Sequence, residues 1–345
     1  MGVDLGDLTV KNTISLQSLS GKIIAIDAYN MLYQFLASIR QEDGTPLMDY
    51  KGNVTAHLSG LFYRTCKLLE NGIRPVYVFD GKAHSFKEKV QAERAEIKRV
   101  AEKKWKEALE LEKYEDAKKF AQATSRLTSE MVIESKQLLG AMGVPCVQAP
   151  CDGESQAAVM VQNGLAYATA SQDYDALMFG SPTLVRNISI TGRRKVPRQN
   201  RYIMVEPEEI NLEQSLSSLG IDRRKLIIIG LLTGTDFNDG IKGVGPKTAL
   251  KIVQQKKDLD EVISYVKDKY DYDFEVDVHT VFEFFLNPPY KPVDKLDWKM
   301  VDADAVSNIL VEQHDFSEDR VQKTIADLEK ISKERASQSR LEQWF

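Results

Sequence analysis

Seven acidic residues in this 345-residue sequence lie at or just after the ends of apolar segments. They are Asp27, Asp80, Asp152, Glu154, Asp173, Asp175 and Asp236. Short continuous apolar runs separated by helical patterns are typical of buried parallel strands. The carboxyl ends of such strands form one edge of an open α/β sheet, and ligands bind at that edge. We therefore expect the seven carboxylates to converge in one cleft.

Carboxylates gathered in this way repel one another and raise each other's pKa. Cations make such a cluster tolerable, and oxygen ligands without nearby histidine or cysteine favour Mg²⁺ or Mn²⁺ over zinc. The pattern predicts a two-metal site for phosphoryl transfer, with ions about 3.5–4 Å apart. Any one of these acids could instead cap the next helix, as Asp27, Asp80 and Asp152 are placed to do. Seven caps at one edge is the weaker interpretation.

Two basic residues after Asp80 could hold a phosphate at this site. Lys87 and Arg94 are two helical turns apart, so a helix places them on one face. From there they could stabilise the negative charge that develops during hydrolysis. Ordinary solvated helix charges are the alternative.

A glycine-rich turn, KGVGPKT at 242–248, suggests a second phosphate contact. Gly243 and Gly245 permit a tight turn, and the proline suits the first position of the next helix. Backbone N–H groups at a helix start bind phosphate, and Lys247 and Lys251 add positive charge on the same side. We therefore expect this turn to bind the phosphates of a DNA duplex without contacting the base edges. A packing joint between two helices is the alternative.

Charges are segregated along the chain, so the net charge of −5 argues only weakly against a nucleic-acid partner. No acid occurs at 176–205, and this range contains Arg193, Arg194 and Lys195 in an expected β-hairpin. That hairpin tip faces either solvent or phosphates. The segment 81–130 is rich in Lys, Arg and Glu and poor in large apolar residues. It predicts projecting helices, either a solvated pair or a mobile arch over the active site.

The remaining patterns predict β-α-β units that build a doubly wound sheet. Helices are expected at 31–40, 54–69, 129–142, 226–232, 246–255 and 302–332. No apolar run approaches the roughly 20 residues that a membrane span needs, so no membrane partner is expected. Three cysteines and four histidines in no paired spacing predict neither disulfides nor zinc, which indicates a reducing compartment.

These segments together resemble flap endonucleases of the archaeal–eukaryotic type, a family of structure-specific 5′ nucleases. The resemblance covers essentially the whole chain. It is carried, in order, by MGVDLGDL, AIDAYNMLYQF, YRTCKLLENGIRPVYVFDGK, APCDGESQAA, ASQDYDALMFGSP and TGTDFNDGIKGVGPKTAL. It implies a mainly parallel twisted sheet flanked by helices, with an inserted helical arch at 81–130 and a helix–two-turn–helix at 223–256.

The resemblance also implies domain limits and residue roles. One nuclease domain spans 1–331, with an N-terminal part at 1–100, an internal part at 131–215 and C-terminal helices at 298–331; a flexible tail follows at 332–345. Asp27, Asp80, Asp152 and Glu154 match the ligands of a first Mg²⁺, and Asp173, Asp175 and Asp236 match those of a second. Lys87 and Arg94 match a basic pair on the gateway helix, and Tyr33 matches an aromatic that stacks near the cleaved strand. DNA contacts are expected from Arg40, Thr55, Arg64, Arg193, Arg194, Lys195, Gly243, Gly245, Lys247, Thr248 and Lys251. The helix–two-turn–helix of the family also holds a monovalent cation, often K⁺.

One position departs from the family. Cys151-Asp152 stands where the family usually has Ser-Glu. Because the aspartate side chain is one carbon shorter, the sequence leaves two alternatives open: Asp152 ligates its ion directly or through water.

The last eight residues, QSRLEQWF, resemble the motif that docks replication proteins onto the sliding clamp (PCNA). Leu341, Trp344 and Phe345 would fill an apolar pocket, while Gln338 would hydrogen-bond beside it. A tail that folds back onto its own domain is the alternative.

The expected function is hydrolysis of a phosphodiester at a single-strand/duplex junction, as a 5′ flap endonuclease with accompanying 5′–3′ exonuclease activity. The product is a ligatable nick in DNA replication, as in Okazaki fragment processing, and in repair. A related bubble or junction nuclease, a non-catalytic clamp-bound scaffold and a small-molecule phosphatase are the alternatives. A monomer in the cytoplasm of a nucleus-free cell is expected, or in the nucleus of a eukaryote.

Overall fold

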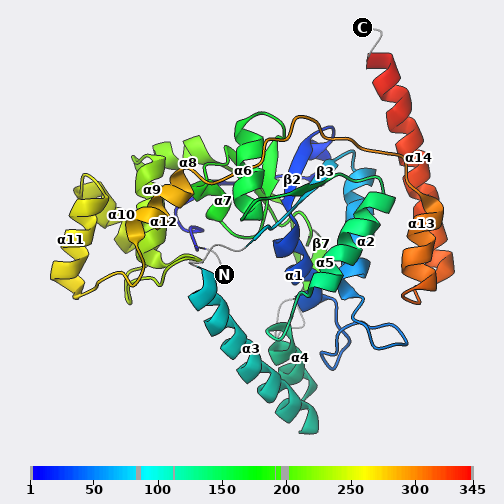
Figure 1. The fold of residues 1–345 in the computed structure, drawn as a ribbon, viewed down its shortest axis with the longest axis horizontal. Helices are drawn as coiled ribbons and strands as arrows, with labels where there is room; N and C mark the ends of the chain where they lie inside the picture. Colours follow the sequence, from blue (N-terminus) through cyan, green and yellow to red (C-terminus); the bar gives the residue numbers. More distant parts are fainter. Residues whose placement is uncertain (1–2, 83–86, 112, 191, 196–201, 343–345) are drawn as a thin grey trace.

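A seven-stranded sheet forms the centre of the molecule (Figure 1). The computed structural model describes residues 3–82, 87–111, 113–190, 192–195 and 202–342, without the side chains of 87–95, 193–195 and 334–342. The strand order is β1-β9-β6-β5-β2-β3-β4. The bounds are β1 Lys11–Thr13, β2 Ile23–Asp27, β3 Arg74–Phe79, β4 Cys146–Gln148, β5 Ala168–Ala170, β6 Thr183–Arg186 and β9 Glu208–Asn211.

Five neighbouring strands, β6, β5, β2, β3 and β4, pair in parallel, as predicted. The central strands β2 and β3 are almost fully buried, which explains their continuous Val and Ile content. The strands β1 and β9 add an antiparallel edge beside β6, which the sequence patterns did not predict. The α/β class with a mainly parallel sheet is confirmed.

Helices cover both faces of the sheet. The helices α1 (Ala28–Ser38), α2 (Ala56–Glu70) and α5 (Ser129–Ala141) pack on one face, where their apolar side chains form a single core with β2 and β3. The helix α6 (Gly153–Gln162) packs on the other face against Ala25, Val76 and Val78. The sheet is thereby buried on both sides, and its carboxyl edge is left for ligands.

A helical lobe lies to one side of the sheet (Figure 1), and its core includes Leu184 of β6 and Ile210 of β9. It contains α7 Asp175–Met178, α8 Leu212–Leu219, α9 Arg223–Thr233, α10 Pro246–Gln255, α11 Leu259–Tyr270 and α12 Val278–Leu286. Phe179, Phe237, Phe284 and Phe285 form its aromatic centre, with ring centroids 4.8–6.3 Å apart. Phe237 directly follows Asp236, so this packing anchors the loop that carries that acid.

Two helices in the segment 81–130 project from the body of the molecule, α3 (Lys87–Glu110) and α4 (Tyr114–Gln122) (Figure 1). They pack on each other, and Trp105 Nε1 donates to the carbonyl of Asp43 at 3.3 Å. The expected hairpin is a ribbon of β7 (Gly192–Lys195) and β8 (Tyr202–Val205). Both features agree with the sequence patterns.

The carboxy-terminal helices return to the core of α2 and α5. They are α13 (Ala303–Ser307), a π-helical turn η2 (Asn308–Glu312) and α14 (Glu318–Glu342). The helix α14 continues well past residue 332, where we expected a flexible tail to begin, because its i,i+4 pairs such as Glu329–Lys333 continue the helical pattern. Across the described residues, no helix combines the length and apolar character needed to cross a membrane.

Candidate metal centre and nucleic-acid contacts

The seven carboxylates come from the carboxyl ends of neighbouring parallel strands and from the adjoining helical lobe. Asp27 is the last residue of β2, Asp80 directly follows β3, and Asp173 lies shortly after β5. Asp175 is the first residue of α7, and Asp152 and Glu154 lie at the start of α6. Electrostatic interactions connect all of them, including Asp236 in the loop after α9. The structure therefore gathers the seven predicted carboxylates.

Three members of the cluster carry strongly raised pKa values. Burial and then the charge of Asp80 raise the pKa of Asp27. Burial and then Asp175 raise the pKa of Glu154, and burial and then Asp236 raise the pKa of Asp175. Glu154 thus lies electrostatically between the two predicted ligand groups. Like charges held in a desolvated cleft demand a compensating cation.

Backbone N–H groups orient four of the carboxylates. Asp27 and Asp152 cap α1 and α6, since their Oδ1 atoms accept from the amides of Asn30 (3.1 Å) and Ser155 (3.2 Å). Asp27 and Asp152 therefore do cap helices, as the alternative interpretation proposed, and they also belong to the carboxylate cluster. The amide of Gly153 donates to Asp80 at 2.8 Å, and the amide of Val3 donates to Asp175 at 2.8 Å.

Side chains that the sequence patterns did not single out orient two more of the carboxylates. Asn30 Nδ2 donates to Asp173 Oδ2 at 2.8 Å, and the Ser171 hydroxyl donates to Glu154. A Cβ on Gly153 would lie 2.7 Å from Asp80 Oδ1, so a larger residue there would displace this carboxylate from the amide that holds it. Of these supporting residues, only Asn30 could have been found from the sequence, because it lies three residues after Asp27, which caps the same helix. The other contacts join segments that are far apart in the sequence, so no periodic pattern of residues predicts them.

The donor set fits a hard divalent cation. It is oxygen-only, largely buried, like-charged and hydrogen-bonded from behind. The described side chains do not by themselves form a finished shell, because no three Asp, Glu, His or Cys side chains among them converge closely enough to hold one ion. Repulsion between uncompensated carboxylates favours such spreading.

Tyr33 lies beside the cluster on α1. Its exposed ring contacts Lys98 of α3, whose Nζ lies 4.9 Å from the ring centroid. Tyr29, one turn earlier, has a pKa raised by burial and then by Asp80 and Tyr33, so it too adjoins the cluster. The backbones of Lys87 and Arg94 lie in α3, near its start, whereas their side chains are outside the described residues.

The glycine-rich turn presents an exposed helix start. Gly243 adopts φ +85°, which favours glycine, and Gly245 is the cap of α10 at φ −91°, which any residue adopts. Lys247, Thr248 and Lys251 are exposed, while Val244 and Ala249 beneath them are buried. Lys247 forms a 2.8 Å ion pair with Asp7, which the sequence did not predict.

Arg40 contacts other parts of the protein. Its guanidinium donates to the carbonyls of Leu36 (2.9 Å) and Gly44 (2.9 Å) and to Ser125 Oγ (3.1 Å), and burial lowers its pKa. Thr55 is buried at the start of α2. Arg64 is half-buried, which lowers its pKa. In this structure Arg40 therefore supports the chain between α1 and α2, and its contact with DNA stays a prediction.

The remaining predicted contacts are placed only by their backbone. Arg193, Arg194 and Lys195 lie in β7, opposite Met204, Ile203 and Tyr202 of β8. Gln338 and Leu341 lie in α14. Trp344 and Phe345 are outside the described residues.

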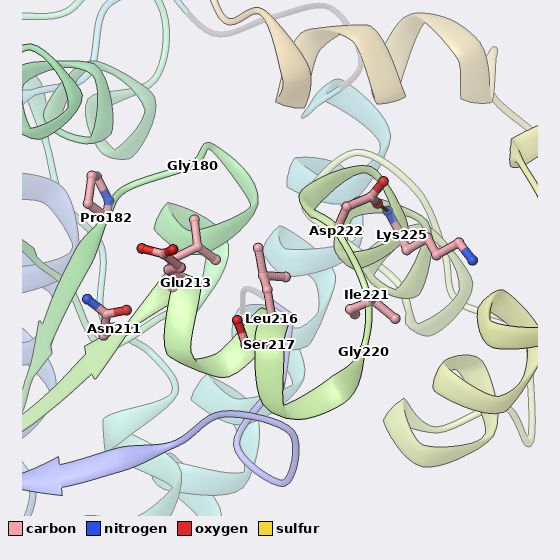
Figure 2. A pocket seen from close by; sticks show the side chains of 11 residues that line it. Gly180, Pro182, Asn211, Glu213, Leu216, Ser217, Gly220, Ile221, Asp222 and Lys225 are labelled. Carbon is pink, nitrogen blue, oxygen red and sulfur yellow. Dashed lines mark hydrogen bonds between the residues drawn. The ribbon is translucent and has the colours of Figure 1, made fainter.

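A pocket of about 580 Å³ lies between α8 and the start of α9, away from the carboxylates (Figure 2). Asn211, Leu216, Asp222 and Lys225 are among its lining residues. Pro182, also in its wall, precedes β6, so the pocket adjoins the amino end of that strand. The cluster and this pocket therefore lie at opposite edges of the sheet.

Comparison with known proteins gives consistent matches over the whole chain. Residues 5–101 match the XPG N-terminal domain and residues 143–236 match the XPG I-region. Flap endonuclease 1 of Aeropyrum pernix is 51% identical, with 100% of both chains covered. Flap endonuclease 1 of Pyrococcus furiosus is 49% identical and covers 100% of this chain and 99% of the relative.

Solved structures show the same fold. The flap endonuclease-1 from Methanococcus jannaschii superposes with a TM-score of 0.75 at 39% identity, over 97% of this chain and 100% of that one. The catalytic core of Rad2 in complex with DNA substrate has a TM-score of 0.67 at 24% identity, over 94% and 97% of the two chains. At that identity, the second match indicates the fold alone.

Proposed function

Because this chain belongs to the flap endonuclease family of XPG-type nucleases, we propose that its seven-carboxylate cluster is where the DNA backbone is hydrolysed. The enzyme is a structure-specific 5′ flap endonuclease of DNA replication and repair, and its family uses divalent metal ions. The observation that carries our assignment of the site is the buried, mutually repelling set of carboxylates at the carboxyl edge of the sheet.

The cluster holds two Mg²⁺ ions, for which Mn²⁺ can substitute. Asp27, Asp80, Asp152 and Glu154 hold the first ion, and Asp173, Asp175 and Asp236 hold the second. The repulsion between Asp27 and Asp80 and between Asp175 and Asp236 supports this division. Glu154, whose strongest like-charge neighbour is Asp175, lies between the two groups. When bound, such ions supply positive charge that activates water and stabilises the leaving oxygen. Asn30, Gly153, Ser171 and Val3 hold the carboxylates in place for them.

Residues on α3 and α1 bring the DNA strand to the cluster. Lys87 and Arg94 contact the scissile phosphate, and Tyr33 stacks on a base of the unpaired strand. The contact between Tyr33 and Lys98 supports this assignment, because it places the first half of α3 beside α1. The projecting pair α3 and α4 forms an arch through which the single-stranded flap passes. The products carry a 5′-phosphate and a 3′-hydroxyl, and a 5′–3′ exonuclease activity accompanies flap cleavage.

The start of α10 and the β7–β8 ribbon grip the duplex backbone. The exposed N-terminus of α10, with Lys247, Thr248 and Lys251, seats phosphates and holds a K⁺ ion beside the turn at Gly243. The basic residues of β7 add contacts that read no bases. Because a junction interrupts base stacking, the DNA bends there at little cost. The enzyme therefore recognises its substrate by the shape of the DNA and not by its base sequence.

Residues 338–345 bind the sliding clamp, and the enzyme is a monomer away from it. The motif QSRLEQWF supports the clamp assignment. Its setting is the cytoplasm of a nucleus-free cell, as the full-length matches to the Aeropyrum and Pyrococcus enzymes favour.

The direct test is cleavage of end-labelled DNA with and without Mg²⁺. We expect metal-dependent cutting of a 5′ flap near its junction, and slower cutting of bubbles and four-way junctions. A small phosphomonoester should not be hydrolysed. A preference for the four-way junction, or product in the presence of a chelator, would contradict the proposed function.

A further inference from the structure

The side chain of Gln148, the last residue of β4, reaches the end of the neighbouring strand β3. Its Nε2 donates to the carbonyl oxygens of Asp80 at 2.6 Å and of Phe79 at 3.2 Å. A third carbonyl oxygen, that of Ala149, lies 3.3 Å from the same nitrogen. Gln148 therefore holds Asp80, a member of the carboxylate cluster, by its backbone.

Lys136 of α5 fixes the orientation of this side-chain amide. Its Nζ lies 2.6 Å from Gln148 Oε1 and 4.8 Å from the ring centroid of the buried Phe79. An ammonium group only donates hydrogen bonds, and carbonyl oxygens only accept them. The oxygen of the Gln148 amide must therefore face Lys136, and its NH₂ group must face the three carbonyl oxygens. These two residues are called the Lys136–Gln148 pair below.

The carboxylate of Asp80 is held separately, by the start of α6. The amide of Gly153 donates to Asp80 Oδ1 at 2.8 Å. Gly153 lies between Asp152 and Glu154, the two acids of α6 that belong to the cluster. A shift of the Asp80 backbone therefore changes how its carboxylate lies relative to these two acids, which are proposed ligands of the same ion.

The backbone that follows Asp80 is packed closely against the segment 148–153. The amide of Gly81 donates to the carbonyl of Cys151 at 2.7 Å. A Cβ on Gly81 would collide with the backbone carbonyl of Ala149, so the two segments approach each other where glycine allows it. Because both neighbours of the Asp80 peptide unit are held, a hydrogen bond to its carbonyl also fixes where its side chain begins.

We infer that Lys136 and Gln148 are positioning residues for metal binding, because they hold the Asp80 backbone so that its carboxylate meets the first ion. This inference rests on the proposed function. Groups that hold a metal ligand from behind change metal affinity by about 10- to 100-fold when they are removed. The Lys136–Gln148 pair acts on the ligand's backbone and not on its carboxylate. Its loss should therefore have a smaller effect, of about 3- to 10-fold.

The positive charge of Lys136 distinguishes positioning from a purely electrostatic effect. A lysine near the cluster repels a metal ion, so removal of its charge would by itself strengthen metal binding. Loss of positioning weakens metal binding instead, because the amide of Gln148 can then rotate away from the three carbonyl oxygens. Lys136→Leu therefore changes metal affinity in opposite directions under the two accounts. Lys136→Arg keeps the charge and a donor and should bind metal as the wild type does.

The test measures Mn²⁺ binding to the DNA-free protein, with unbound Mn²⁺ followed by electron paramagnetic resonance. Gln148→Leu and Lys136→Leu should each bind Mn²⁺ about 3- to 10-fold more weakly than the wild type. The double variant should be no weaker than Gln148→Leu alone, because both substitutions remove the same contact. Gln322→Leu is the control. It removes an exposed side-chain amide on α14 that donates to Ser307 Oγ at 3.3 Å, and it should leave Mn²⁺ affinity unchanged.

Two further measurements separate positioning from a general loss of structure. Flap cleavage by Gln148→Leu should need about 3- to 10-fold more Mg²⁺ for its half-maximal rate, while KM for the flap and kcat in saturating Mg²⁺ stay within about 2-fold of wild type. Its Tm in chelator should stay within about 2 °C of wild type. The rise in Tm on adding subsaturating Mg²⁺ should be smaller, because stabilisation by a ligand follows its affinity for the folded protein.

Unchanged Mn²⁺ affinity in Gln148→Leu would overturn the inference, as would tighter Mn²⁺ binding by Lys136→Leu. A raised KM for the flap at unchanged Mn²⁺ affinity would also overturn it, since the pair would then act on DNA contacts. If Gln148→Leu does not fold, Lys136→Leu provides the same comparison. A wild type that binds no Mn²⁺ contradicts the proposed function instead. Amide exchange at Gly153, whose N–H donates to Asp80, then still tests the positioning, because it should be faster in Gln148→Leu than in Gln322→Leu.

Discussion

At the scale of single residues, the carboxylate cluster combines two roles that compete for the same oxygen atoms. Asp27 and Asp152 cap helices with Oδ1, while burial and repulsion make the ionised cluster costly. A protein that retains such a cluster gains stability from whatever cation binds the folded form and not the unfolded chain. On the proposed function, metal binding and folding are therefore linked at this site.

Asp173→Asn should abolish cleavage and leave flap binding intact. The amide can still accept the hydrogen bond from Asn30 but carries no charge for an ion. Because changes behind a ligand already cost 10- to 100-fold, loss of the ligand should lower kcat by at least about 100-fold. Gel cleavage assays and fluorescence anisotropy measure the two quantities. Asp304→Asn, an exposed acid on α13, is the matched control, and full turnover by Asp173→Asn would remove this residue from the metal site.

The metal-free protein should lose stability as the pH rises above about 4, where the carboxyl groups of the unfolded chain ionise. The pKa values of Asp27, Glu154 and Asp175 are raised by folding, so the unfolded chain releases these protons at lower pH than the folded protein does. Ionisation in the folded state therefore costs stability at higher pH, and the loss ends above the folded pKa values. Calorimetry in chelator should show this decline, and Mg²⁺ should reverse it most strongly at pH 8.

Glu154→Gln should flatten that pH dependence, because it removes one buried charge and keeps an acceptor for Ser171. Each unit of lost pKa shift corresponds to about 1.4 kcal/mol, or about 2 °C in Tm for a chain of this size. The variant should be more stable than wild type in chelator at pH 8 and gain less from Mg²⁺. A variant that is less stable than wild type in chelator at both pH 5 and pH 8 would contradict this account.

At the scale of elements, the start of α10 shows how an exposed helix terminus can be partly covered in the free protein. Lys247 is 2.8 Å from Asp7, and both side chains are largely exposed, so the pair is weak. A DNA phosphate can therefore replace Asp7 at little cost. Lys251, one turn later on the same face, is also exposed and adds charge to the same helix start.

Lys251→Gln should weaken duplex binding about equally for all sequences. Removing one phosphate contact should lower the slope of log affinity against log salt concentration by about 1. Anisotropy titrations at several salt concentrations measure this slope. Lys299→Gln, an exposed lysine in the extended segment after α12, is the control. An unchanged slope would exclude Lys251 from the phosphate contact.

At the scale of the whole molecule, the mixed sheet places the carboxylate cluster between the two regions that we propose contact DNA. The lobe of α7–α12 extends from one side of the sheet, and α3 and α4 project from its carboxyl edge (Figure 1). The carboxy-terminal helix α14 leaves the body beyond α2 (Figure 1). Residues near its end can therefore reach a partner without covering the cluster.

Deletion of 338–345 should leave basal flap cleavage unchanged and remove stimulation by the sliding clamp. Among the described side chains of α14, Ile331 is the last that packs on the core. The deleted segment lies beyond it, so the domain should fold as before. Cleavage with and without added clamp measures the effect. Equal stimulation of the truncated and full chains would refute the clamp assignment.

Local sequence patterns by themselves determined the parallel strands, most helices and the seven acids at one edge of the sheet. These follow from periodicity and from the order of residues along one strand or turn, which are local properties. The expected tail is an exception, since the structure continues α14 to Glu342. Family resemblance added the roles of Lys87, Arg94 and Tyr33, which spacing alone left open.

Tertiary structure alone decided which groups support those acids. Val3 reaches Asp175 across 172 residues and Asn30 reaches Asp173 across 143, so no local pattern records either contact. The same holds for the β1–β9 edge and for the internal hydrogen bonds of Arg40. These contacts depend on how the layers pack. Packing brings together groups whose positions along the chain are unrelated, and it sets the burial that shifts their pKa values.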